Sequence, residues 1–387
     1  MATKSAKPLR FTALHLENWR NFTFVDVKLQ QRAFLVGPNA AGKSNLLDAL
    51  RFLHDLVAVG GGFQETVGKR GGVSKLRSLA ARRYPDVVIR VNIGSDDEPA
   101  AWTYEVSFAQ DNRQRAFIKR ERVTRDGVAI IDRPDDKDKG DPERLTQTYL
   151  EQINANLEFR AVNDFLKTIR YLHIVPQLVR DPDRSVGRIN DPYGGDFLEQ
   201  IARTTEKTQK ARLHRIGEAL KVAVPQLAEL TLWRDETKGA PHLRRKYDHW
   251  RPQGAWQTEE QFSDGTLRLI GLLWAILDGA GPLLLEEPEL SLHPEVVRFL
   301  PQMFARIQSR TGRQILTSTH STDLLRDESI GLDEVILLRP SAEGATVATA
   351  GDRAEARTLL DSGLSMADVI VPLTRPEHAA QLSLFGG

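Results

Sequence analysis

Residues 34–57, FLVGPNAAGKSNLLDALRFLHDLV, constrain the fold more than any other stretch of this chain. The apolar run Phe34–Val36 predicts a buried strand, and apolar residues from Leu46 to Val57 recur at helical spacing. The segment between them matches the phosphate-binding P-loop at every position, Gly37-Pro38-Asn39-Ala40-Ala41-Gly42-Lys43-Ser44. The sequence therefore predicts a strand–loop–helix unit that holds a polyphosphate.

The chemistry of such a loop needs these residue types in this order. Glycines let the backbone curl so that its N–H groups point at phosphate oxygens, and the N-terminus of the helix adds positive potential. We expect Lys43 to reach the β- and γ-phosphates, the Ser44 hydroxyl to hold Mg²⁺, and Asn45 to complete the loop. An ordinary glycine-rich turn is the weaker alternative.

The composition is that of an ordinary globular protein, with 41% hydrophobic and 27% charged residues. The 387 residues suffice for two domains or for one large α/β unit with an insertion. Because 53 Lys and Arg stand against 52 Asp and Glu, only local clusters can indicate nucleic acid binding. The chain has no cysteine, which excludes disulfides and thiolate metal sites. The basic start of the chain lacks an apolar signal core, and no apolar run approaches the length of a membrane span, so we expect a cytoplasmic protein without a membrane partner.

Apolar periodicity outlines the rest of the chain. Residues 9–30 alternate as two strands and lead into the P-loop strand, so we expect them to pair beside it. Residues 132–143, DRPDDKDKGDPE, are so polar that they predict a solvated loop. Further strands are expected at 87–94, 102–109 and 116–123, and helices at 145–170 and 197–222.

A second chemically dense stretch begins at Phe262. Ser263 or Asp264 is suited to cap the apolar helix 267–277, which leaves N–H groups pointing outward from its first turn. A plain capped core helix explains this stretch equally well. The following apolar strand ends in Glu286, Glu287 and Glu289, and P-loop enzymes keep a Mg²⁺ ligand and a water-activating base at such a strand tip. Three acids exceed what a turn needs, so we favour this role over mere strand-end markers.

A lone histidine follows the next strand, at Ser318-Thr319-His320-Ser321. Such a histidine is more often structural than catalytic. Here it follows the paired acids and stands at another strand tip, which favours a sensor of the γ-phosphate.

Together these motifs resemble the ATPase head of ABC-type proteins, and among them the RecF/SMC/OLD-like AAA_21 predicted ATPases of bacteria. The resemblance implies an α/β P-loop NTPase whose mixed sheet core carries an antiparallel β lobe and a helical insertion. It also implies that two heads enclose two ATP molecules. One subunit then supplies the P-loop, Glu286, Glu287 and His320, and the other supplies Ser263 and Gly265 of the signature-like Ser263-Asp264-Gly265.

The chain departs from this family pattern in two places. The metal-binding position usually holds Asp, whereas Glu286 is one methylene longer, so Mg²⁺ held through water and slow turnover are expected consequences. Spacing does not identify the metal-sensing glutamine; Gln177 is our first candidate and Gln64 our second. We expect the head to comprise residues 1–60 and 256–350, with an insertion at 61–255, a helical segment at 351–371 and a flexible tail at 372–387.

Basic clusters at residues 113–125 and at Arg244-Arg245-Lys246 suit either a phosphate backbone or a solvated strand face. The chain ends with apolar residues that need a place to bury, in Gln381-Leu382-Ser383-Leu384-Phe385. This end resembles the pentapeptide by which bacterial replication and repair proteins bind the sliding clamp. Docking of the tail on its own domain is the alternative.

We therefore expect a cytoplasmic ATPase that uses ATP and Mg²⁺, forms an ATP-dependent homodimer and acts on DNA in repair or anti-phage defence. Glu287 is the expected general base, Ser44 and Glu286 hold Mg²⁺ with Gln177 nearby, and Lys43 stabilises phosphate charge. The first alternative is a slow ATP-bound switch that holds or activates a separately encoded effector, a nuclease or toxin. A transporter motor is the second alternative and requires a membrane subunit.

Overall fold

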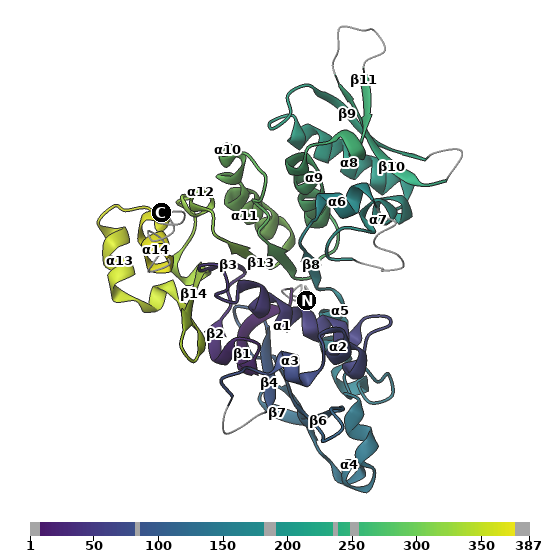
Figure 1. The fold of residues 1–387 in the computed structure, drawn as a ribbon, viewed down its shortest axis with the longest axis vertical. Coiled ribbons are helices and arrows are strands. Elements are labelled where there is room, and N and C mark those ends of the chain that lie inside the picture. The colour runs from purple at the N-terminus through teal and green to yellow at the C-terminus, as the bar shows by residue number, and fades with distance from the viewer. Residues whose placement is uncertain (1–7, 82–85, 182–190, 235–238, 248–254, 376–387) are drawn as a thin grey trace, which may run out of the picture. The chain divides into compact units, whose positions relative to one another are not determined.

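The computed structural model describes residues 8–81, 86–181, 191–234, 239–247 and 255–375 (Figure 1). The chain divides into two compact units. Unit 1 comprises residues 1–169, 280–284 and 301–387, and unit 2 comprises residues 170–279 and 285–300. No helix in the described ranges is long and apolar enough to cross a membrane.

The strand that precedes the P-loop lies inside a sheet of unit 1. β3 (Arg32–Val36) pairs in parallel with β13 (Ile315–Thr319) on one side and with β14 (Val335–Ser341) on the other. β15 (Gly344–Thr349) extends the sheet as an antiparallel strand beside β14. Every residue of β3 and β13 is buried, as expected for parallel strands covered on both faces. The predicted mixed α/β core is thereby confirmed.

A second sheet of unit 1 is antiparallel, with the order β2-β1-β4-β5-β6-β7. The three strands expected at 87–94, 102–109 and 116–123 are confirmed. The expectation that residues 9–30 pair beside the P-loop strand is wrong, because a tight turn folds β2 back along β1 and the other edge of β1 receives β4. The strands are β1 (Arg10–Trp19), β2 (Phe22–Lys28), β4 (Val87–Gly94), β5 (Trp102–Gln110), β6 (Ala116–Arg125) and β7 (Val128–Arg133).

Helix α1 (Lys43–Val57) joins the P-loop to the core of unit 1. Its Phe52 stacks on Phe108 of β5 at 5.5 Å between ring centroids, and Trp19 of β1 meets Phe52 edge-on at 5.4 Å. The helix expected at 145–170 is helical mainly over α5 (Arg160–Lys167). The other helices of unit 1 are α2 (Phe63–Lys69), α3 (Val73–Leu76), α4 (Asp136–Gly140), α11 (Leu300–Thr311, from residue 301 on), α12 (Thr322–Leu325), α13 (Ala354–Asp361) and α14 (Met366–Thr374).

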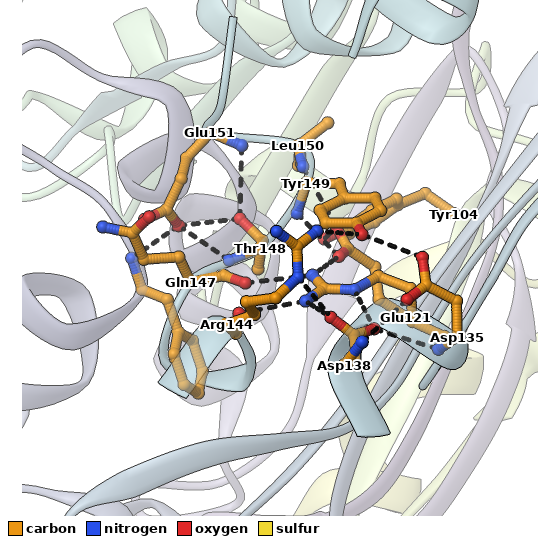
Figure 2. A network of polar contacts seen from close by, with 12 residues as sticks. Tyr104, Glu121, Asp135, Asp138, Arg144, Gln147, Thr148, Tyr149, Leu150 and Glu151 are labelled. Carbon is orange, nitrogen blue, oxygen red and sulfur yellow. Dashed lines mark hydrogen bonds and ion pairs between the residues drawn. The ribbon is translucent and has the colours of Figure 1, made fainter. Parts of the chain in front are cut away.

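Residues 132–143 do not form the solvated loop that their composition predicts (Figure 2). Asp135 and Asp138 form a capping box at the start of α4, and the side chains of Arg133 and Asp138 are fully buried. Arg133 donates to Asp138 at 2.8 Å and to Glu121 of β6 at 2.9 Å. These charged side chains can be buried because each is paired with an opposite charge and also forms hydrogen bonds to the backbone.

Unit 2 combines helices with a small antiparallel sheet of order β11-β10-β9. Its strands are β9 (Leu227–Arg234), β10 (Pro241–Tyr247) and β11 (Ala255–Thr258). The helix expected at 197–222 is two helices, α7 (Phe197–Arg203) and α8 (Glu206–Leu220). Unit 2 also holds β8 (Arg170–Leu172), α6 (Pro176–Arg180), α9 (Asp264–Leu277), α10 (Pro294–Val297) and the end of β12 (Leu283–Glu286).

Candidate functional site

The P-loop of unit 1 has the backbone that phosphate binding requires. Gly42 is the N-cap of α1 with a φ of 97°, a left-handed conformation that favours glycine, and no side chain caps this helix. A Cβ at Gly42 would overlap the Asn21 side chain and lie 2.7 Å from Phe22 Cζ. A Cβ at Gly37 would likewise overlap the carbonyl oxygen of Leu338. The loop therefore has the tight curvature and the uncapped helix start that fit a triphosphate.

The Lys43 side chain is folded over this loop. Its Nζ donates to the carbonyl oxygens of Gly37 at 2.8 Å and Pro38 at 3.1 Å, and Lys43 is only 6% exposed. Ser44 is exposed beside it. A phosphate entering the loop gives the ammonium a charged acceptor, which forms a stronger hydrogen bond than a neutral carbonyl. Mg²⁺ needs few protein ligands when phosphates supply the rest, so Ser44 and one carboxylate suffice.

The turn between β1 and β2 supports the P-loop. Asn21 Nδ2 donates to the carbonyl oxygen of Ala41 at 3.2 Å, and Asn21 Oδ1 accepts from Asn45 Nδ2 at 2.8 Å. Trp19 Nε1 donates to the carbonyl oxygen of Asn45 at 2.7 Å. Asn45 thus anchors the loop through its side chain and its carbonyl. Sequence reasoning missed Asn21, because residues 18–22 carry only the signal of a turn.

Helix α1 is also fixed by an ion-pair network. Asp48 lies 2.8 Å from Arg70 and 3.1 Å from Arg20, and Arg70 also contacts Asp55 at 2.9 Å. Burial by itself raises the pKa of Asp48, but Arg70 and Arg20 together hold that pKa below its ordinary value. The first turns of α1 are therefore held to α2 and to the β1–β2 turn.

His320 lies at the P-loop edge of the parallel sheet. Thr319, the last residue of β13, pairs with Val36, the last residue of β3. His320 and Gly37 are the next residues of these two parallel strands, so both follow the same end of the sheet. His320 is exposed there.

The acidic strand tip belongs to unit 2. The Tyr171 hydroxyl donates to Glu286 Oε2, and His173 Nδ1 lies 3.3 Å from the Glu286 carbonyl oxygen. Glu287 has a φ of 44°, a left-handed backbone that is rare for residues other than glycine. Such strained positions concentrate at functional sites, where the surrounding structure holds them. Tyr171 precedes Glu286 by 115 residues, so no local pattern indicates this contact.

The signature-like turn of unit 2 is a capped helix start. Ser263 Oγ accepts from the Thr266 N–H at 3.3 Å, which confirms the predicted cap of α9. A Cβ at Gly265 would overlap the carbonyl oxygen of Ser291. Arg180 Nη2 holds the turn from outside by donating to the Phe262 carbonyl oxygen at 2.7 Å and to Asp264 at 2.6 Å. The turn is thus fixed on both sides by residues of unit 2.

Arg268, one turn further along α9, faces the acidic strand tip. It lines a small cavity with Glu286 and Pro288, and its Nε is buried without a hydrogen-bond partner among the described residues. Burial lowers the pKa of Arg268, while Asp264 and Glu287 act in the opposite direction. Sequence reasoning missed Arg268 as a candidate site residue.

The remaining predicted site residues are placed as follows. Gln177 lies exposed in α6 of unit 2. Gln64 of unit 1 is engaged elsewhere, since its Nε2 donates to the carbonyl oxygens of Ala116 and Thr146 at 2.9 Å each. Unit 1 holds Lys43, Ser44 and His320, whereas unit 2 holds Gln177, Ser263, Gly265, Glu286 and Glu287. The pentapeptide Gln381–Phe385 lies outside the described residues.

The basic cluster at residues 113–125 is largely neutralised within unit 1. Arg120 lies 2.9 Å from Asp132, and Arg122 lies 3.7 Å from the same carboxylate. Arg115 lies 2.8 Å from Glu143, and Arg125 lies 3.9 Å from Asp126. These pairs favour the solvated strand face over a phosphate-binding surface.

Comparisons with known proteins agree with this architecture. Residues 32–327 match the family model described as "AAA domain, putative AbiEii toxin, Type IV TA system". A search of curated proteins finds no match. Among solved structures, the Smc head bound to the C-winged helix domain of ScpA is similar at 13% identity and a TM-score of 0.53, over 87% of this chain and 96% of that chain. The Smc head domain with an extended coiled coil bound to the C-terminal domain of ScpA, derived from Pyrococcus furiosus, is similar at 11% identity and a TM-score of 0.53, over 92% of this chain and 99% of that chain. At these identities the likeness concerns the fold, and it confirms the predicted P-loop ATPase head.

Proposed function

The chain belongs to the AAA_21 family, and from this membership we propose that it hydrolyses ATP as an ATP-dependent homodimer and acts on DNA in repair or anti-phage defence. The P-loop carries the proposal. Its glycines leave no room for a Cβ, α1 begins without a side-chain cap, and Lys43 Nζ is held over the loop by two carbonyl oxygens. These three features together favour the binding of a triphosphate in the loop.

Each site residue has a defined role in this proposal. Lys43 Nζ and the loop N–H groups bind the β- and γ-phosphates and stabilise the negative charge that develops on them. Ser44 and Glu286 hold Mg²⁺, with Gln177 as its sensor; the ion neutralises phosphate charge when bound. Glu287 accepts the proton of the attacking water and orients it, while His320 donates a hydrogen bond to the γ-phosphate.

The second subunit completes the site in this proposal. Ser263 caps α9 with its own hydroxyl, so the partner's γ-phosphate meets the positive N-terminal end of that helix. Gly265 has no side chain that could block the partner's γ-phosphate. The Ser291 carbonyl oxygen, which leaves no room for a Cβ at Gly265, also fixes the turn. Dimerisation then depends on ATP, since the triphosphate is the group that both subunits bind.

DNA is the proposed substrate because two basic side chains on the sheet of unit 2 have no acidic partner among the described residues. The arginines of β6 are paired with acids, whereas Arg244 and Lys246 of β10, like Lys119 of β6, form no ion pair with any described residue. The C-terminal pentapeptide adds a second line of support, because a sliding clamp would bring the ATPase to replicating DNA.

Steady-state ATP hydrolysis without DNA, with duplex DNA and with single-stranded DNA tests the proposal, with Glu287→Gln as the blank. We expect hydrolysis by the wild type that DNA stimulates severalfold. Absence of hydrolysis above the blank would overturn the ATPase assignment. Hydrolysis that is slow and indifferent to DNA would remove DNA from the proposal and favour the second function.

The second candidate function is a slow ATP-bound switch that holds or activates a separately encoded effector. It is favoured by Glu286, whose longer side chain stands where Asp is usual and whose carboxylate accepts a hydrogen bond from Tyr171. The family description also names a toxin system. For this function a protein should co-purify with the Glu287→Gln variant in ATP and be released from the wild type during hydrolysis. A chain that purifies alone in both states contradicts it.

A further inference from the structure

The three-stranded sheet of unit 2 has a face of aromatic and basic side chains that the proposed ATP chemistry does not use. Directly opposite residues of antiparallel strands share a face. The register places His242 opposite Trp233, Arg244 opposite Thr231, and Lys246 opposite Trp256. We call the set Trp233, His242, Arg244, Lys246 and Trp256 the platform.

Four of the platform residues, Trp233, His242, Arg244 and Trp256, contact one another across the three strands. The Arg244 guanidinium lies 4.4 Å from the ring centroid of Trp256 on β11 and 5.8 Å from that of Trp233 on β9. The Trp233 ring in turn lies 5.6 Å from the His242 ring. Trp256 is 42% exposed, a large fraction for an indole ring. An arginine between two tryptophans is held in place, so little entropy is lost when a ligand joins the stack.

The opposite face of β10 is buried, which identifies the platform as the outer face. Leu243 is fully buried, and Arg245 is 5% exposed. The guanidinium of Arg245 lies 4.4 Å from the Phe262 ring and 4.3 Å from the Tyr247 ring. The alternation along β10 therefore presents Arg244 and Lys246 outward and Arg245 inward.

Two of the three basic residues of the platform lack an acidic partner in the described part of the chain, whereas His242 Nδ1 lies 2.7 Å from the buried Glu259 carboxylate. Neither Arg244 nor Lys246 forms an ion pair with a residue in the described ranges, and Arg244 Nε has no hydrogen-bond partner there. Glu229, opposite Lys246, is the acid that the register places on this face. The arginines of β6, in contrast, have paired acids. A polyanion is the ligand that such charge attracts.

A pocket of about 490 Å³ adjoins the platform along β9 and α8. Its lining includes Arg244 and Trp256, with Lys210 and His214 of α8 and the acids Glu218 and Glu229. Thr231 Oγ1 also lines it and is buried without a hydrogen-bond partner among the described residues. The volume is within the range of small-molecule sites, so it accommodates a group of nucleobase size that offers polar edges.

We infer that the platform binds single-stranded nucleic acid. The indole faces of Trp256 and Trp233 stack on unpaired bases, the pocket beside them receives a base edge, and Arg244 and Lys246 bind the phosphates. A duplex hides the faces of its bases, so stacking on these rings requires a single strand. The inference deepens the proposed function and rests on it, because it names the surface and the form of nucleic acid that the ATPase engages.

Fluorescence anisotropy on the full chain tests this inference. The probes are a labelled single-stranded DNA of about 16 nucleotides, the same sequence as a duplex, and the same sequence as RNA. Trp256→Ala should raise the Kd for the single strand roughly 5- to 100-fold, the range seen when a stacking aromatic is removed. Trp256→Phe keeps a ring and should lose much less. Arg244→Gln should weaken binding and lower the slope of log K against log salt by about 1.

Two matched variants in unit 1 serve as controls. Phe24→Ala removes an aromatic ring that is more than half exposed, and Arg125→Gln removes an arginine that stacks on a tryptophan, Trp102, at 5.2 Å. Both should bind the single strand as the wild type does. Circular dichroism and ATP hydrolysis without nucleic acid should be unchanged in all variants.

The outcomes separate this inference from the proposed function. If the platform variants lose single-strand binding and the control variants keep it, the platform is supported. If the wild type prefers the RNA probe, RNA replaces DNA in the proposed function. If the wild type binds DNA and the platform variants match the controls, the platform is overturned; the proposed function stands, but its DNA must then bind at a surface other than Arg244 and Lys246. A wild type that binds only duplex overturns the platform, and one that binds no probe overturns both.

Discussion

Arg133 Nη1 and Glu121 Oε2 lie 2.9 Å apart, and neither side chain is exposed to solvent. Glu121 also accepts hydrogen bonds from the backbone N–H groups of Tyr149 at 2.7 Å and Leu150 at 3.1 Å. Burial raises the pKa of Glu121 above its ordinary value, and these N–H groups and Arg133 oppose that rise. The pair therefore joins β6 and the end of β7 to the segment that leads into α5.

Replacing Arg133 should destabilise unit 1 strongly. Arg133→Met leaves Glu121 buried without its cation and Asp138 with Arg144 as its remaining cation, and breaking a buried pair on one side costs about 3–5 kcal/mol. The matched control is Arg120→Met, whose partner Asp132 is about half exposed, and such surface pairs contribute about 0–1 kcal/mol. The free energy of unfolding in urea measures both. Equal losses in the two variants would contradict a stabilising role for the buried pair.

The stability of unit 1 should depend on Asp138 in acid. Burial alone raises the pKa of Asp138, but Arg133 and the Asp135 N–H lower it to about 2, from an ordinary value of 3.8. Because the folded-state pKa is the lower one, the contribution is complete above about pH 4 and is lost as the pH falls towards 2. The shift corresponds to about 2 kcal/mol.

Urea unfolding of Asp138→Asn between pH 7 and pH 2 measures this contribution. The difference from the wild type should shrink between about pH 4 and 2, because both then lack the charge. Asp136→Asn, an exposed change in the same helix, should differ little from the wild type at any pH. A difference for Asp138→Asn that stays constant with pH would exclude its carboxylate as the cause.

Lys43→Ala should weaken ATP binding roughly 100-fold or more, because a buried ammonium that pairs with phosphate charge is lost. Binding of a fluorescent ATP analogue to the full chain measures the effect. Lys69→Ala, on the surface of α2, is the control and should bind as the wild type does. Tight binding by the Lys43 variant would remove the P-loop assignment.

Glu287→Gln should accumulate as an ATP-bound dimer, because the proposed general base is lost while ATP binding is expected to be retained. Light scattering after size exclusion with ATP measures the mass, and Glu295→Gln, a mostly exposed change in α10, is the control. Wild-type hydrolysis by Glu287→Gln would move the general base elsewhere.

Adding Gly265→Ala to Glu287→Gln should abolish this dimer without reducing ATP binding. The added Cβ overlaps the Ser291 carbonyl oxygen and should displace the turn that is proposed to face the partner's nucleotide. The same light-scattering measurement reports the mass, and the fluorescent analogue reports binding. A double variant that still dimerises with ATP would show that the signature-like turn has no part in the interface.

The C-terminal pentapeptide should bind a sliding clamp. Replacing Leu384 and Phe385 with Ala removes the apolar pair expected to fill the pocket of the clamp and should eliminate retention on an immobilised bacterial clamp. Glu377→Ala, in the same tail, should be retained. Retention of the Leu384 and Phe385 variant would refute the clamp interpretation.

The parts of this fold that the sequence predicts are those set by short-range chemistry. The strand before Gly37, the helix from Lys43 and the Ser263 cap each depend on residues within a few positions of one another. The strands of the antiparallel lobe were also predictable, because β4 alternates buried and half-buried residues over most of its length.

The failures concern partners that are distant in the sequence. Nothing near β1 indicates that it pairs with β4 instead of β3. The polar composition of residues 132–143 predicts solvation, since it does not reveal that Glu121 lies where Arg133 needs an anion. For the same reason the sequence did not predict that Asn21 contacts Asn45 of the P-loop or that Tyr171 contacts Glu286, because in both cases the two residues belong to separate elements.

Strand β10 couples the two faces of its sheet mechanically. Arg244 belongs to the outer face, and the next residue, Arg245, packs against Phe262, which immediately precedes Ser263. Because Arg244 and Arg245 are neighbours in one strand, we expect a shift of β10 caused by a ligand at Arg244 to move the Arg245–Phe262 contact as well. A movement of β10 would in this way reach Ser263, which caps α9. This is the position at which the partner's nucleotide is expected to bind.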